Sequence, residues 1–184
     1  ERLLSASGPC GGHVERPSDK VAPKKIAWIQ CVGSRNENNS NPWCSSVCCM
    51  YAAKQCVIAK EHDPGVEQTV FYMELRSFGK DFDKFIDKAK NDSGVHYKRA
   101  MVAEVIEDPE TKNLFIHHVN EKGELVNEEF DMVVLSIGFE PHDEAAEFAQ
   151  IFGIQTDSYG FAETSKLSPV ETSRKGVFVA GTYQ

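Results

Sequence analysis

The stretches IAWIQCVGSR (residues 26–35) and NPWCSSVCCMYAAKQ (residues 41–55) set the expected fold of this chain. The first opens with a short apolar run, which predicts a buried strand over residues 26–30. Residues 32–43 are rich in Gly, Ser, Asn and Pro, which predicts a loop. From residue 42 to residue 60, apolar side chains recur at three- and four-residue steps, which predicts a helix. A strand, a loop and a helix therefore follow one another, with four cysteines around the turn.

The same alternation continues for one more unit. Residues 68–75 are rich in β-branched and aromatic side chains and predict a second strand. A second amphipathic helix is expected after Asp81, and a third strand is expected over residues 95–99. This order of strands and helices implies a parallel sheet with helices packed on it. The second helix would bury one face, made of Phe82, Phe85, Ile86 and Ala89.

The pattern then changes to three short stretches with period-2 alternation, separated by turns at residues 108–110 and 121–123. They predict an antiparallel β-meander, and a fully apolar strand follows it. The expected fold class is α/β, with a three-layer, nucleotide-binding-like domain that combines a parallel sheet and an antiparallel β-meander. This layout is typical of the inserted domain in flavoproteins that have two dinucleotide-binding domains. The expected strands are residues 101–107, 113–119, 125–130 and 131–136.

The C-terminal part predicts a helix over residues 142–156, then a loop and a last strand over residues 176–180. We expect three segments: an irregular lead-in over residues 1–24, the cysteine-bearing domain over residues 25–136, and a partial FAD domain over residues 137–184. The chain lacks an initiator methionine and stops at the expected last strand. We therefore expect an internal fragment of a longer protein.

Composition argues against several classes of function and location. The formal net charge of −8 argues against a nucleic-acid partner, because binding phosphates needs concentrated Lys and Arg. No apolar run approaches the roughly 18–20 residues that cross a bilayer, so no direct membrane insertion is expected. The first residues lack the apolar segment of an export signal, which predicts a cytoplasmic protein. In a reducing compartment, six cysteines are ligands or buried thiols more often than disulfides.

Four cysteines have the spacing Cys31-x12-Cys44-x3-Cys48-Cys49. Cys31 is expected at the carboxyl end of the first strand, where open α/β sheets bind their ligands. Cys44 is expected at the start of the first helix, with Cys48 one turn later on the same face. Free N–H groups at a helix start favour negative charge and lower thiol pKa values. Four thiolates that converge there would select an iron–sulfur cluster, zinc or copper(I).

Three other interpretations stay open. Buried cysteines can be inert, and this is the expected role of Cys56 in the helix and of Cys10 in a flexible loop. Structural zinc also takes four thiolates, although an adjacent Cys-Cys pair is unlike the usual spacing of zinc ribbons. A dithiol–disulfide reductase would use Cys48 with Cys49, or Cys44. Its usual Cys-x-x-Cys motif is absent.

A dinucleotide site is disfavoured. The first strand runs into a turn that has only Gly33 where a Gly-x-Gly-x-x-Gly fingerprint would stand. Glu74 would suit a ribose hydroxyl and Arg76 a phosphate, yet both equally suit a surface ion pair. We therefore do not expect a nicotinamide dinucleotide at this turn.

Taken in order along the chain, several motifs resemble the A-type subunit of heterodisulfide reductase and the related A-type subunit of quinone-interacting membrane-bound oxidoreductase. The match extends over essentially the whole chain. The cysteine motifs IQCVGSR (residues 29–35), CSSVCC (44–49) and AKQ (53–55) carry most of it. Shorter matches are GP (8–9), GG (11–12), RPSD (16–19), FYM (71–73), Arg76, FGK (78–80), VVLS (133–136) and PVET (169–172). Cys10 departs from the pattern, which has Thr there.

The resemblance implies a subunit of an oxidoreductase with a thioredoxin-reductase-type flavin module. It implies a [4Fe–4S] cluster on Cys31, Cys44, Cys48 and Cys49, and FAD in the full-length protein. Gly181 and Thr182 would approach the flavin, and Gly138 would mark the return to the FAD domain. Other redox subunits would be the partners. The N-terminal FAD fingerprint is absent, so the isolated chain is not expected to be catalytically complete. Arg35 and Lys54 are candidate positive charges near the cluster.

Overall fold

The structure is a computed structural model that describes residues 2–39 and 41–184. The chain divides into two units, residues 1–138 and residues 139–184. The division falls just after Gly138, close to the expected end of the cysteine-bearing domain. That the second unit is part of an FAD domain stays a prediction.

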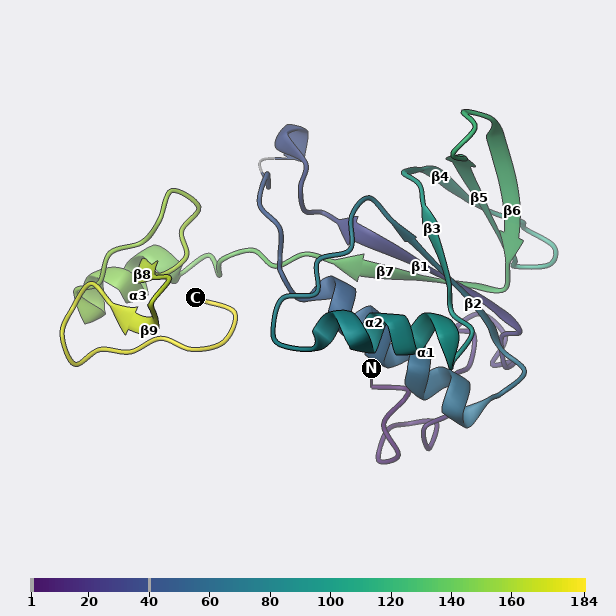
Figure 1. Cartoon of the computed structure of the whole chain (residues 1–184), viewed down its shortest axis with the longest axis horizontal. Helices are drawn as coiled ribbons and strands as arrows, with labels where there is room; N and C mark the ends of the chain where they lie inside the picture. The colour runs from purple at the N-terminus through teal and green to yellow at the C-terminus, as the bar shows by residue number, and fades with distance from the viewer. Residues whose placement is uncertain (1, 40) are drawn as a thin grey trace. The chain divides into compact units, whose positions relative to one another are not determined.

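A four-stranded parallel sheet forms the middle of the first unit (Figure 1). Its strand order is β3-β2-β1-β7, and every neighbouring pair is parallel. The strands predicted over residues 26–30, 68–75, 95–99 and 131–136 form it, so the predicted parallel sheet is confirmed. The strands are β1 Lys25–Val32, β2 Glu67–Tyr72, β3 His96–Arg99 and β7 Met132–Ile137.

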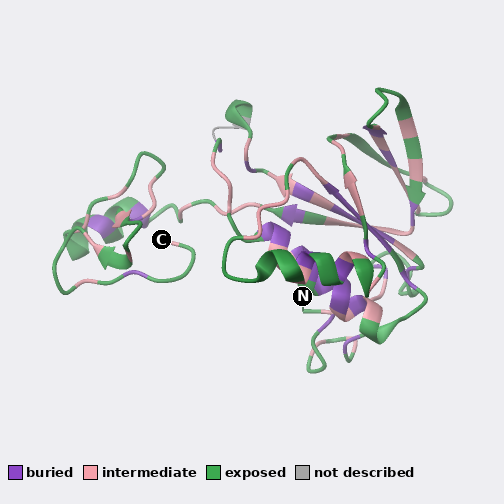
Figure 2. Ribbon diagram, viewed as in Figure 1, coloured by how far each residue is buried: buried purple, intermediate pink, exposed green. Residues whose placement is uncertain are grey.

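Two helices cover one face of this sheet. Side chains alternate along β1, and Ile26 and Trp28 point toward the helices. There they pack with Ala52 and Cys56 of α1 and with Ala89 of α2. Figure 2 shows the buried residues along β1 and β2 and on α1. The helices are α1 Cys48–His62 and α2 Phe82–Asn91, and a short 3-10 helix, η1, spans Glu37–Asn39.

An antiparallel meander packs on the opposite face. Ala27 of β1 and Phe71 of β2 meet Ile116 and Phe130 of the meander, and all four are at most 1% exposed. Helices, parallel sheet and meander therefore make three layers, as predicted. The meander strands are β4 Val102–Glu107, β5 Leu114–Val119 and β6 Leu125–Phe130, in the order β4-β5-β6.

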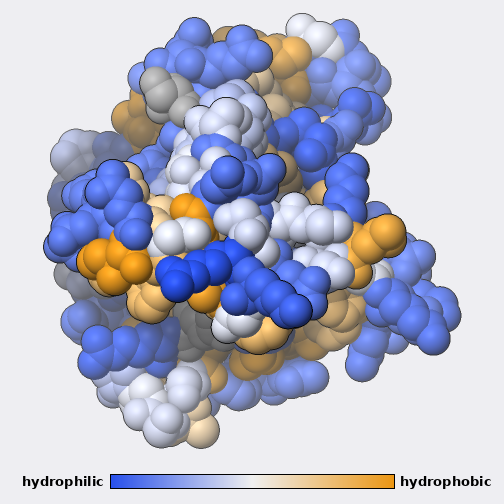
Figure 3. All heavy atoms as spheres, turned by 90° about the vertical axis from the view of Figure 1, so that its left-hand side faces the viewer, coloured by the Kyte–Doolittle hydropathy of each residue, from blue (hydrophilic) through white to orange (hydrophobic). Residues whose placement is uncertain are grey.

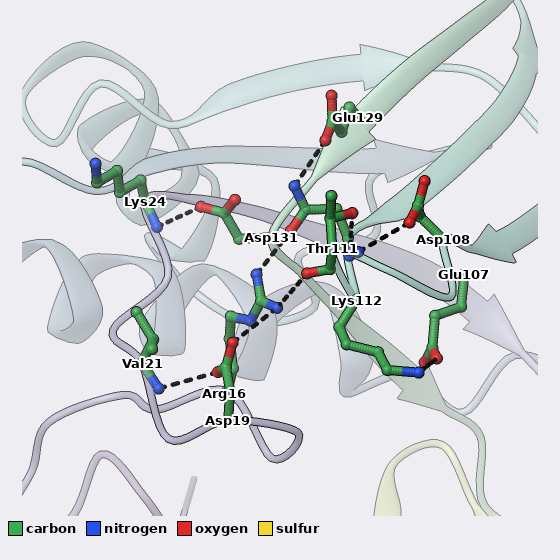
Figure 4. A network of polar contacts seen from close by, with 11 residues as sticks. Arg16, Asp19, Val21, Lys24, Glu107, Asp108, Thr111, Lys112, Glu129 and Asp131 are labelled. Atoms are coloured by element: carbon green, nitrogen blue, oxygen red, sulfur yellow. Dashed lines mark hydrogen bonds and ion pairs between the residues drawn. The ribbon is translucent and has the colours of Figure 1, made fainter.

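The lead-in is irregular but is attached to the meander. Arg16 is 8% exposed. Its guanidinium donates to Asn113 Oδ1 at 2.7 Å and to the Thr111 carbonyl at 2.9 Å, and it pairs with Asp19 Oδ2 at 3.0 Å (Figure 4). These contacts tie the lead-in to the turn between β4 and β5. Arg16 belongs to the RPSD motif, so this part of the motif has a structural role.

Replacing Arg16 with Ala should lower the free energy of unfolding by about 1.5–3 kcal/mol, because hydrogen bonds from a buried charged group are lost. Lys112→Ala is the matched control: its ion pair with Glu107 at 3.0 Å is exposed at the same turn. Exposed pairs contribute about 0–1 kcal/mol. Denaturant unfolding of both variants measures the difference. Equal effects would contradict a structural role for Arg16.

The second unit contains α3 Ala145–Phe152 and a small hairpin of β8 Thr164–Ser165 and β9 Ser168–Thr172. α3 is shorter than predicted, because Gly153 takes a left-handed conformation and its N–H bonds back to the carbonyls of Ala149 and Gln150. The hairpin was not predicted.

The strand predicted over residues 176–180 is wrong. Phe178 makes only an isolated bridge with Glu171, and no continuous ladder forms there. Positive φ angles at Gly176 and Gly181 bound this apolar run and keep it short. Large hydrophobic side chains of this unit are exposed, among them Ile151 and Phe178. On the face drawn in Figure 3, hydrophobic side chains stand in separate groups among hydrophilic ones.

Candidate metal centre

An irregularity in β1 positions Cys31. Opposite β7, Ile29 pairs with Leu135 and Val32 pairs with Ile137, so β1 has one more residue than its partner between these pairs. Such a bulge re-aims side chains. Cys31 lies inside it with a positive φ of 61°, which is uncommon for a residue other than glycine. Regular alternation would turn Cys31 toward the meander, with Ala27 and Ile29. The bulge instead lets its thiol reach α1.

The thiol of Cys48, the first residue of α1, lies between two other sulfurs. Its sulfur is within hydrogen-bond reach of both Cys31 and Cys49, and its single proton can be donated to one of them at a time. This donation lowers the pKa values of Cys31 and Cys49 and raises the pKa of Cys48. Cys48 and Cys49 are buried, and Cys31 is half-buried. Three of the four predicted ligands therefore meet where the β1 bulge faces the start of α1.

Cys44 is placed differently from the prediction. α1 begins at Cys48, so Cys44 lies in the preceding loop and shares no helix face with Cys48. The reason is local: Ser46 has a left-handed φ of 63°, which a helix cannot contain, and its N–H donates to Cys44 Sγ at 3.4 Å. Cys44 still borders the centre, because its sulfur lies close enough to the Arg76 guanidinium to help raise the pKa of Arg76.

Two arginines and one glutamate surround the cysteines. Glu74 Oε2 pairs with Arg35 Nη2 at 3.0 Å and with Arg76 Nη2 at 2.8 Å. The predicted alternative of a surface ion pair for Glu74 and Arg76 is confirmed. Arg76 also donates its backbone N–H to Cys49 Sγ at 3.4 Å, and the Arg35 side chain beside Cys31 helps to lower the pKa of that thiol. Two guanidinium groups against one carboxylate leave positive charge beside the thiols.

Arg35 was expected from the sequence as a charge near the cysteines, whereas Arg76 was not. The predicted parallel sheet could have indicated this position for Arg76. β1 and β2 are neighbours in that sheet, and their carboxyl ends meet at one edge. Arg76 follows β2 as Arg35 follows β1. Lys54 is exposed on α1, and its predicted role near the cluster stays a prediction.

Three polar atoms beside the cysteines are buried without a hydrogen-bond partner in the described part of the chain: Ser34 Oγ, Ser45 Oγ and Arg35 Nη1. Each can donate a hydrogen bond. Buried donors in proteins almost always have an acceptor. Spare donors and excess positive charge suit an anionic, sulfur-rich group on the four cysteines. By its donor chemistry, the site therefore fits the implied cluster.

Among residues 2–39 and 41–184, no three or more His, Cys, Asp and Glu side chains are arranged to hold a metal ion. The assignment of Cys31, Cys44, Cys48 and Cys49 as metal ligands stays a prediction.

The predicted flavin-side residues lie in both units. Gly138 packs against the serines of the cysteine loops: a Cβ on it would stand 2.8 Å from Ser34 Cβ and 3.0 Å from Ser45 Oγ. Gly181 has a φ of 86° and open space at its Cβ position. Thr182 lines a cavity of about 460 Å³ in the second unit. A role at a flavin stays a prediction for all three.

The remaining two cysteines stand apart from the centre. Cys56 is fully buried between α1 and the sheet, and burial raises the pKa of its thiol. Cys10 lies in the irregular lead-in. Along the described residues, no helix combines the length and apolar character that crossing a membrane requires.

Comparison with known proteins defines the class. The family described as pyridine nucleotide-disulphide oxidoreductase matches residues 46–183, and the chain belongs to this family. A crystal structure of LpdA from Mycobacterium tuberculosis shares the fold, with a TM-score of 0.51 and 16% identity, over 89% of this chain and 30% of LpdA. The predicted α/β fold is confirmed.

Among the members of this family, the chain is similar to A-type subunits of heterodisulfide reductases. The chain is 43% identical over its whole length to the second iron-sulfur A-type subunit of the CoB–CoM heterodisulfide reductase of Methanopyrus kandleri. The identity is also 43% to the A-type subunit of the H2/formate:CoB-CoM heterodisulfide,ferredoxin reductase of Methanococcus maripaludis. The chain spans 28% of the length of each relative. The predicted resemblance to the heterodisulfide reductase A-type subunits is confirmed, and both the family and these relatives are oxidoreductases by name.

The contact at Gly138 gives a test of the packing around the cysteine loops. Gly138→Ala should lower the free energy of unfolding by about 1–3 kcal/mol, because the added methyl group overpacks against Ser34. Gly65→Ala is the matched control, since its new methyl group would meet only the carboxylate of Asp63 at 3.2 Å. Denaturant unfolding compares the two variants. A loss at Gly138 no larger than at Gly65 would show that the loops are not packed as described.

Proposed function

We propose that this chain is the electron-transfer segment of a flavin- and iron–sulfur-containing oxidoreductase of the heterodisulfide reductase A type. Cys31, Cys44, Cys48 and Cys49 would hold a [4Fe–4S] cluster. The observation that carries the proposal is the bulge in β1, which turns Cys31 out of the sheet's alternation and toward Cys48. A strained backbone at a cysteine that meets other thiols is typical of a functional site.

The cluster would supply one-electron transfer at a potential set by burial, charge and hydrogen bonds to sulfur. The residues of the chain prepare the site for it. Arg35 and Arg76 favour the thiolate forms that bind iron, because their positive charges lie beside the sulfurs. Cys48 and Cys49 are at most 5% exposed, so their side of the site excludes water.

The flavin and the partners belong to the longer protein in this proposal. Members of the matched family are named for pyridine nucleotide and disulfide chemistry, and the curated relatives are named as single subunits of larger reductases. We infer that the full-length protein binds FAD, with Gly181, Thr182 and Gly138 toward the flavin. Other redox subunits would give electrons to the cluster or take them from it.

The test is anaerobic reconstitution followed by EPR, with each of the four cysteines replaced by Ser in turn. Each replacement should abolish or alter the signal of the reduced cluster, because a ligand is lost. Cys10→Ser is the control and should leave the signal intact, because Cys10 lies in the lead-in. An unchanged signal in the Cys31 or Cys49 variant would refute the ligand set.

A dithiol–disulfide reductase is the second candidate, with Cys31 and Cys48 as the redox pair in place of the predicted Cys48–Cys49 or Cys44, because the thiols of Cys31 and Cys48 are in contact. These two thiols would lose two protons and two electrons to form one S–S bond, and a disulfide substrate would take up both to become two thiols as its own S–S bond breaks. This candidate predicts a protein without iron that forms a Cys31–Cys48 disulfide on oxidation. Mass spectrometry of the oxidised, metal-free and the reconstituted chain separates the two functions.

A further inference from the structure

Two serine hydroxyls beside the cysteines make no hydrogen bond within residues 2–39 and 41–184. Ser34 is 3% exposed, and its Oγ has no partner in the described part of the chain. Ser45 Oγ is buried in the same unpartnered state. Ser136 provides the contrast: it is fully buried nearby on β7, and its Oγ accepts a hydrogen bond from Gln30 Nε2 at 3.0 Å. Burial alone therefore does not explain the two spare hydroxyls.

Gly138 brings the two serines together. Ser34 Oγ lies 3.3 Å and Ser45 Oγ lies 3.0 Å from the point where a Cβ on Gly138 would stand. The absent side chain leaves room for both hydroxyls at the carboxyl end of β7. The neighbouring Ile137 carbonyl accepts a hydrogen bond at 3.0 Å from Tyr51 Oη of α1, which ties this strand end to the helix that carries Cys48 and Cys49.

Both serines are held next to a predicted ligand. The backbone N–H of Ser34 donates to the Cys31 carbonyl at 3.2 Å, so Ser34 closes the turn that starts at the bulge. Ser45 directly follows Cys44 in the sequence. Arg35 Nη1, the third unpartnered donor, belongs to a side chain that contacts Cys31. The spare donors therefore border two different cysteines from two different loops.

We propose that Ser34 and Ser45 donate hydrogen bonds to the sulfur atoms of the bound cluster and raise its potential. The inference rests on the proposed function. Donors to sulfur stabilise the reduced, more negative state, so each bond makes reduction easier. Gly138 supplies the room that the two hydroxyls share.

The test is an EPR-monitored redox titration of the anaerobically reconstituted chain and its variants. Ser34→Ala and Ser45→Ala should each shift the midpoint potential to a more negative value, and the double variant should shift it further. Ser46→Ala is the control: Ser46 is exposed, and its Oγ donates to the Cys44 carbonyl at 3.4 Å rather than to a sulfur. Iron content equal to that of the unmodified chain ensures that the shift is not loss of the cluster.

A second readout needs no cluster. In the metal-free chain, Ser34→Ala should leave the midpoint of thermal unfolding unchanged or raise it, because the hydroxyl satisfies nothing there. Ser136→Ala should lower the midpoint, because Gln30 loses its acceptor.

The outcomes separate the two proposals. A cluster that assembles with the same potential in both serine variants overturns the inference and leaves the proposed function standing. A drop in unfolding midpoint for metal-free Ser34→Ala like that of Ser136→Ala would also overturn it, by showing a structural partner for the hydroxyl. An unmodified chain that takes up no iron refutes the proposed function itself.

Discussion

The extra residue in β1 is the constraint on which the candidate centre depends. Without it, Cys31 would continue the alternation of the strand and face the meander, far from the start of α1. The bulge and the left-handed backbone of Cys31 bring its thiol to Cys48. Bulges are over-represented next to active sites, where they re-aim a side chain. The end of β1 thereby forms one side of the cysteine site.

The other sides of the candidate centre are formed by loops at the ends of the parallel strands. Parallel strands end together at one edge of the sheet, so the loops after β1, β2 and β7 converge there. They bring Arg35, Arg76 and Gly138 to the cysteines, although these residues are far apart in the sequence. The glycine-rich turn that would hold a dinucleotide's phosphates is absent at this edge, and thiols with spare donors stand there instead. An edge that commonly binds anions thus suits an anionic cluster.

The sequence predicted the layers because its periodicities are strong. The apolar run at residues 26–30 reflects a strand that is buried on both faces. The alternation over residues 101–130 reflects strands that are buried on one face. The start of α1 was missed because apolar spacing does not report the left-handed Ser46 that delays the helix. The contact of Arg76 with Cys44 and Cys49 was missed because it depends on which strands are neighbours. The apolar run near Phe178 is bounded by two left-handed glycines and lacks a full pairing partner, so it forms no strand.

In the proposed function, the four cysteines hold an iron–sulfur cluster rather than a single ion or no metal. Iron, acid-labile sulfide and zinc measurements on the anaerobically reconstituted chain test it most directly. We predict about four iron and four sulfide per chain, with the visible absorption of a cluster. About one equivalent of zinc without iron or visible absorption would contradict the claim, because zinc alone fills a four-thiolate structural site.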